Sequence, residues 1–89
     1  MPVDPTVEDI KTLVEIRNMA AEKIAIGHFK PGLYLMGQLK KEVENRDLEM
    51  SFFNNMQNEI FAIVKETSND PAILVLFEQY LHRVQLKMH

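Results

Sequence analysis

The glycines and prolines of this 89-residue chain are few and clustered, and they divide it into segments with helical spacing. Apolar residues recur every three or four positions between these breakers, which forms one apolar face on an α-helix. The pattern predicts an all-α fold, a three- or four-helix bundle. The expected helices lie near residues 5–26, 31–46, 48–66 and 71–88.

The first helix has two candidate N-terminal signals. Asp4-Pro5 reads as an N-cap followed by proline at the first helical position, and Thr6 with Asp9 is a competing cap. Gly27 is the expected end. The predicted inward stripe consists of Val7, Ile10, Leu13, Val14, Ala21 and Ile24.

The end of the second helix is open to two interpretations. Asn45-Arg46-Asp47 can form a short turn in which Asp47 caps a third helix, or it can continue as exposed helix, because it contains neither glycine nor proline. In the second case 31–66 forms one helix of about 36 residues, which spans about 54 Å. The inward residues expected on 31–66 are Leu35, Met36, Leu39, Val43, Leu48, Phe52, Met56, Ile60 and Ile63.

The last helix begins after the polar run Thr67-Ser68-Asn69 with a second Asp-Pro pair, Asp70-Pro71. Its first half, residues 73–77, is apolar on every side of the helix. A helix of this kind is normally buried all round, and a small bundle rarely encloses one helix completely. We therefore expect part of residues 73–80 to be covered by another chain.

Length and composition indicate one small soluble domain, residues 1–89. The chain has a net charge of −3 and 46% hydrophobic residues. It has no cysteine, and this excludes disulfides, thiolate metal sites and cysteine nucleophiles. The start lacks the features of a signal peptide, and no apolar run approaches the roughly 18 residues of a membrane span. The expected location is the cytoplasm.

The residues that could carry chemistry do not form a recognisable catalytic pattern. Glu78 and His82 are four apart, whereas the di-iron helix signature needs Glu and His three apart, repeated on a second helix. His28 and His89 have no partner at ligand spacing. There is no nucleophile-elbow turn and no phosphate-binding glycine loop. We expect no enzyme activity, no cofactor, no metal site and no small-molecule substrate.

A DNA-binding regulator is the alternative from another functional class. Residues 22–39 contain a helix, a glycine-bearing turn and a helix, and Lys30, Lys40 and Lys41 would then contact DNA. The pI near 5.5 does not favour binding to nucleic acid.

The excess of methionine and phenylalanine favours a protein-interaction module. Methionine adapts to irregular surfaces, and an apolar excess that one small bundle cannot bury marks a protein contact. We expect a small adaptor, chaperone or regulatory subunit that self-associates into a homo-oligomer or covers a partner's helix. The predicted partner-binding residues are Phe53, Phe61, Ile73, Leu76, Phe77 and Tyr80.

A local resemblance to a known family suggests a more specific function for such a protein-interaction module. Residues 55–57, the step Ser68 to Leu74 with its Asp-Pro-Ala sequence, and Gln79-Tyr80-Leu81 resemble the helical hairpin of type III secretion needle and inner-rod subunits. The resemblance covers about residues 52–84. In size, acidity and helical content the whole chain is similar to small helical chaperones of such systems. The resemblance implies a component or chaperone of a type III secretion system, without assigning any residue a role.

Overall fold

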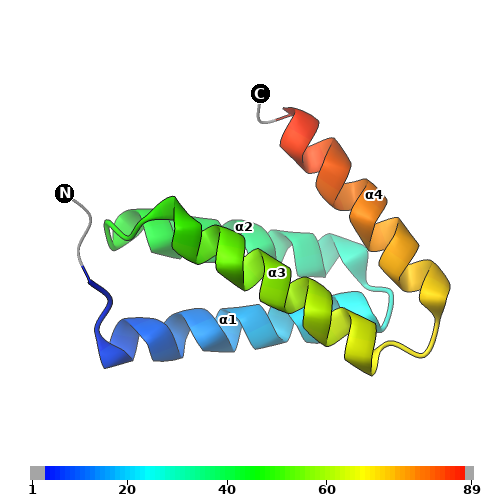
Figure 1. Ribbon diagram of the computed structural model, residues 1–89, viewed down its shortest axis with the longest axis horizontal. Helices are drawn as coiled ribbons and strands as arrows, with labels where there is room; N and C mark the ends of the chain where they lie inside the picture. Colours follow the sequence, from blue (N-terminus) through cyan, green and yellow to red (C-terminus); the bar gives the residue numbers. More distant parts are fainter. Residues whose placement is uncertain (1–3, 88–89) are drawn as a thin grey trace.

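Four α-helices make up the computed structural model, which describes residues 4–87 and side chains as far as Arg83. They are α1 (Val7–Ala25), α2 (Phe29–Asn45), α3 (Met50–Thr67) and α4 (Pro71–Lys87). Figure 1 shows α1, α2 and α3 running along the length of the molecule, while α4 leans away from them. The all-α, four-helix prediction is confirmed, and a single helix over 31–66 is wrong. The predicted end at residue 88 lies outside the described residues.

The first helix begins at the competing cap and not at Asp4-Pro5. The backbone N–H of Asp9 donates to the Thr6 hydroxyl at 3.1 Å, and the Thr6 N–H donates to the Asp9 carboxylate at 3.0 Å. This reciprocal capping box satisfies two backbone donors at once, which explains why the helix starts at Val7.

The turn between α1 and α2 is a Schellman motif centred on Gly27. The His28 N–H donates to the Lys23 carbonyl at 2.9 Å, and the Gly27 N–H donates to the Ile24 carbonyl at 3.0 Å. Gly27 has φ of 86°, the left-handed conformation that this motif requires. The next helix starts at residue 29, two residues earlier than predicted, because Pro31 is tolerated in a first turn whose N–H groups have no intrahelical partner.

The same motif ends α2 without a glycine. Asp47 adopts φ of 56°, the Leu48 N–H donates to the Val43 carbonyl at 3.1 Å, and the Asp47 N–H donates to the Glu44 carbonyl at 3.1 Å. Asp47 therefore ends α2 and does not cap α3. The third helix starts at Met50, two residues later than predicted, after an N-cap residue, Glu49, that makes no side-chain cap bond.

The turn before α4 follows the sequence prediction. The Asp70 carboxylate accepts a hydrogen bond from the Ala72 N–H at 2.9 Å, and the Ser68 hydroxyl accepts one from the Asp70 N–H at 3.3 Å. Asp70 thus provides the N-terminal cap, and Pro71 occupies the first helical position.

The core is shared mainly by α1, α2 and α3, and among the side chains described up to residue 83, α4 contributes one that is buried. Part of the predicted α1 stripe is wrong, since Val7 and Ile10 are 73% and 42% exposed. Between residues 4 and 83, the buried hydrophobic residues are Leu13, Ala20, Ala21, Ile24, Met36, Leu39, Val43, Leu48, Met56, Ile60, Val64 and Phe77.

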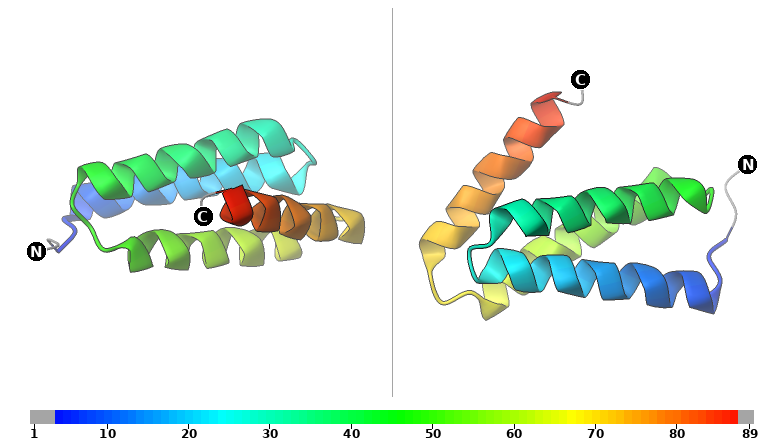
Figure 2. Two further views of the ribbon diagram at one scale, coloured as in Figure 1. Left: turned by 90° about the horizontal axis from the view of Figure 1, so that it is seen from above. Right: turned by 180° about the vertical axis from the view of Figure 1, so that it is seen from behind.

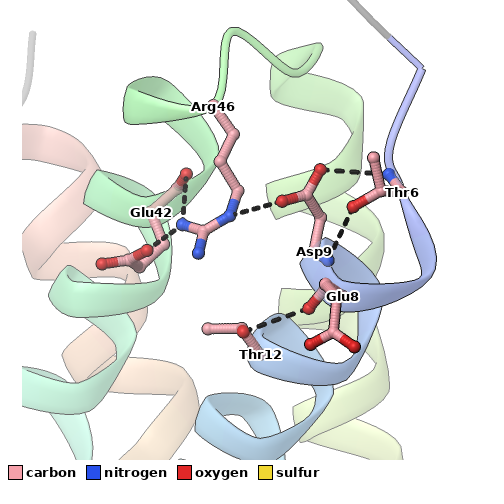
Figure 3. A network of polar contacts seen from close by, with 6 residues as sticks. All are labelled: Thr6, Glu8, Asp9, Thr12, Glu42 and Arg46. Carbon is pink, nitrogen blue, oxygen red and sulfur yellow. Dashed lines mark hydrogen bonds and ion pairs between the residues drawn. The ribbon is translucent and has the colours of Figure 1, made fainter.

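Charged side chains tie α1 to its two neighbours. Arg17 pairs with Glu59 of α3. Figure 3 shows Arg46 at the end of α2 between Glu42 and the Asp9 carboxylate, which it reaches at 2.9 Å. The hydrogen bond from the Thr6 backbone N–H, followed by smaller effects of the Thr6 side chain and Arg46, lowers the pKa of Asp9 despite partial desolvation. This network fixes the start of α1 against the end of α2.

No helix between residues 4 and 87 is both long and apolar enough to cross a membrane.

Candidate protein-binding surface

The inner face of α4 attaches this helix to the bundle through aromatic contacts. Phe77 is fully buried, and its ring stacks on Phe61 of α3 with centroids 5.8 Å apart. The Tyr80 ring stacks on Phe29 of α2 with centroids 5.3 Å apart. Each aromatic pair of this kind stabilises the fold by about 0.5–1.5 kcal/mol beyond the contribution of its buried area. As far as residue 83, the half-buried residues of this face are Ile73, Leu74 and Leu81.

The prediction that Phe77 binds a partner does not fit the structure, because its side chain has no exposed surface. Phe53, Phe61 and Ile73 are half-buried and pack against the core, so they offer only part of their surface. In each case the side chain packs against other residues of the same chain, and this limits the surface that a partner could contact. Leu76 and Tyr80 remain exposed, at 42% and 38%.

The opposite side of α4 is exposed along the described part of the helix. Its residues recur three and four positions apart, so they share one side of the helix. We call this side the α4 outer face, and it consists of Ala72, Val75, Leu76, Gln79, Tyr80 and Arg83. Tyr80 lies at its edge, since its ring also packs on Phe29, and the Arg83 guanidinium lies 5.9 Å from the Tyr80 ring centroid, a cation–π distance.

Val75 is the large apolar residue of this face that sequence reasoning missed, and it is 53% exposed. Because residues 73–77 are all apolar, the sequence alone does not show which of them face inward. The polar residues that follow this run could have shown which side of the helix faces solvent. Gln79 and Arg83 continue the same side of the helix as Val75 and Leu76, opposite Phe77 and Leu81.

The α4 outer face is also open to approach. Figure 1 and the right view of Figure 2 show α4 along one edge of the molecule, inclined to the other helices. Exposed apolar side chains also occur on other helices, such as Val7 on α1 and Tyr34 on α2. The outer face therefore combines apolar exposure with free access, which is typical of a protein contact.

An open cleft of about 500 Å³ separates the inner side of α4 from the first half of α3. Amide side chains from α3 and the polar side chains Glu78 and His82 from α4 surround the ring of Phe61. These groups can hydrogen-bond a polar segment of another molecule. The full lining is Asn54, Gln57, Asn58, Phe61, Glu78, Leu81 and His82.

The side chains described between residues 4 and 83 include no group of three His, Asp or Glu residues that could hold a metal ion. Glu78 and His82 both line the cleft, but no third His, Asp or Glu among the described side chains joins them to form a metal site.

The geometry of α1 and α2 disfavours the DNA-binding alternative. Figures 1 and 2 show the two helices packed side by side, whereas the helices of a helix-turn-helix cross at about 90–120°. Of the three lysines predicted to contact DNA, Lys30 and Lys41 are exposed on α2, whereas Lys40 is partly buried.

Comparison of the chain with protein-family models, curated proteins and solved structures gives no match.

Proposed function

We propose that this chain is a non-enzymatic protein-interaction module, an adaptor, chaperone or regulatory subunit of the cytoplasm, and that the α4 outer face is its binding surface. The supporting observation is the exposure of Val75 and Leu76, at 53% and 42%, on a helix that leans away from the bundle. Burying such a side chain contributes about 1.5–3 kcal/mol. A bound partner would recover this free energy.

The spacing of the outer face suits recognition of a helix or groove. Ala72, Leu76 and Tyr80 follow one another at intervals of four residues, with Val75 beside them. Helix-in-groove recognition uses anchors at such intervals. The inner face meanwhile keeps α4 attached through Phe77, so binding does not require the bundle to unfold.

A role in a type III secretion system is a narrower version of this proposal. The resemblance spans α3, the Asp70-capped turn and most of α4, and subunits and chaperones of that kind act by binding other protein chains. The support for it is the sequence resemblance alone.

Site-specific photocrosslinking in cells that make the protein tests the proposal. A photoreactive residue replaces Val75 or Leu76 in one set of chains and Val7 in the control. Val7 is an exposed apolar residue at the start of α1, and Figure 1 shows this end of α1 on the opposite side of the molecule from the turn between α3 and α4. We expect one discrete protein–protein product from positions 75 and 76 and none from position 7. Equal labelling at all positions, or no product at 75 and 76, contradicts the proposal.

A further inference from the structure

We propose that the cleft between α3 and α4 is a second binding site, which takes an extended peptide segment that carries an apolar side chain next to a basic one. This inference goes beyond the proposed function, because the cleft lies on the inner side of α4 and not on its outer face. The cleft measures about 500 Å³, within the range of about 300–1,000 Å³ typical of ligand sites.

The polar side chains of the cleft are not used within the described chain. Asn54, Gln57 and Asn58 line it from α3, and Glu78 and His82 line it from α4. None of the five makes a hydrogen bond or an ion pair with another residue that the structure describes. A side-chain amide offers a donor and an acceptor together, as a peptide group does. The α3 side of the cleft therefore presents free groups that match a peptide backbone.

The spacing of these amides favours an extended segment over a helical one. Asn54 and Asn58 are four residues apart, which is about 6 Å along a helix. In an extended chain, backbone groups on one edge recur every two residues, or about 6.6–6.8 Å. A helical partner uses its own backbone N–H and C=O groups internally, so it has none to offer the amides. The two amides thus suit alternate residues of one extended segment.

The remaining lining selects the side chains of the peptide. Phe61 and Leu81 are half-buried and form an apolar surface that suits one apolar side chain. Glu78 carries a negative charge, and no lysine or arginine lines the cleft beside it, since Arg83 lies over the Tyr80 ring. This charge attracts a basic side chain and repels phosphate, and the net charge of −3 acts in the same direction.

The first test is an NMR titration of the ¹⁵N-labelled full chain with a capped pentapeptide, Ala-Lys-Leu-Lys-Ala. A lysine on each side of the leucine allows binding in either chain direction. We expect a dissociation constant of about 1 mM. The side-chain amide signals of Asn54, Gln57 and Asn58 should shift, and that of Asn55, which is exposed on α3 outside the cleft lining, should not.

Two altered peptides test the chemistry of recognition. Glutamate in place of both lysines should weaken binding about tenfold or more, because like charges then meet at Glu78. N-methylation of the leucine removes a backbone donor and should weaken binding about fivefold. The second change leaves the charge of the peptide as it was, so it reports on the backbone contacts alone.

Variants of the protein separate the amides from the apolar surface. Asn58→Leu removes a donor and an acceptor and should weaken binding of the lysine peptide about fivefold, whereas Asn55→Leu is the matched control and should leave it unchanged. Glu78→Gln should reduce the preference for lysine over glutamate to about threefold or less.

Three results would overturn the inference. They are no shift of the cleft amides at about 10 mM lysine peptide, equal binding of the lysine and glutamate peptides, and binding that Asn58→Leu leaves unchanged or strengthens. Strengthened binding would identify a simple apolar groove. Photocrosslinking from positions 75 and 76 tests the outer face of α4 separately, so the proposed function stands or fails independently of these results.

Discussion

Gly32 sits at a place where α2 packs closely on α1. A Cβ atom there would lie 3.1 Å from Ile24 Cδ1 and 3.4 Å from the Ala20 carbonyl oxygen, and closer still to Ile24 Cγ1. Ile24 is fully buried and β-branched, so it cannot move away easily. The missing side chain of Gly32 thus allows the close packing of α1 on α2.

Two glycine substitutions on α2 should have opposite effects on stability. Gly32→Ala should lower the free energy of unfolding by about 1–3 kcal/mol, because overpacking outweighs the gain in helix propensity. At Gly37 an added Cβ meets nothing within 4 Å, and Gly37→Ala should raise the free energy of unfolding by about 0.5–1 kcal/mol. Urea unfolding of both variants measures the difference. Effects of the same sign would show that the contact with Ile24 is not tight.

Asp9 should make stability depend on pH in acid. Folding lowers its pKa below the ordinary value of 3.8, first through the Thr6 backbone N–H. The unfolded chain then binds more protons in acid, so the contribution of Asp9 is complete above 3.8 and is lost as the pH falls through the lower folded pKa.

The corresponding variant is Asp9→Asn, which cannot titrate. Its deficit in free energy of unfolding relative to the native chain should be largest above about pH 5 and should shrink in stronger acid. Urea unfolding at a series of pH values from about 6 to about 2.5 measures this. A deficit that does not change with pH would mean that the charge of Asp9 contributes nothing.

At the scale of helices, the sequence predicted well where a signal was local and poorly where it depended on a neighbour. Helix periodicity, Gly27 and the Asp70-Pro71 cap are all local, and the corresponding features were predicted to within two residues. The break at 45–47 was left open because an aspartate, Asp47, and not a glycine, adopts the left-handed conformation.

The inward face of α1 was misjudged for a related reason. Asp9 and Arg17 lie close to the line of Leu13 and Ile24, and they are accommodated by ion pairs with α2 and α3. A pattern based on apolar residues alone shifts the stripe toward Val7, which is exposed. Partners from other helices cannot be seen in the local sequence.

The same limitation affects the candidate surface. Leu76 and Tyr80 were predicted and are exposed, whereas Phe77 was predicted and is buried against Phe61. Within an unbroken apolar run, only the position of the neighbouring helix decides which residues face inward.

Adjacent residues of α4 should therefore differ sharply in their effect on stability. Phe77→Ala should lower the free energy of unfolding by about 3–5 kcal/mol, as expected for a fully buried phenylalanine. Leu76→Ala, one position away on the exposed side, should cost less than about 1 kcal/mol. Urea unfolding of the two variants at low protein concentration measures both. Similar losses would place Leu76 in the core and remove the basis for an outer binding face.

At the scale of the whole molecule, the protein combines a three-helix core with a fourth helix held by a few aromatic contacts. Among the side chains described between residues 4 and 83, the core of α1, α2 and α3 supplies eleven of the twelve buried hydrophobic residues if Leu48, in the turn before α3, is included. The outer side of α4 faces away from this core, which leaves Val75 and Leu76 available for binding.

The most direct test of the α4 outer face as a binding surface is photocrosslinking from a reactive residue placed at position 79. The yield of crosslinked product is compared between chains that also carry Leu76→Asp and chains that also carry Val7→Asp. Gln79 lies on the outer face, between Leu76 and Tyr80 in the sequence, and Val7 is an exposed apolar residue on another helix, α1. We predict that Leu76→Asp lowers the yield about tenfold or more, because one buried leucine contributes about 1.5–3 kcal/mol, while Val7→Asp leaves it unchanged. Equal yields from the two chains, with helical content preserved, would contradict the assignment of the α4 outer face as the binding surface.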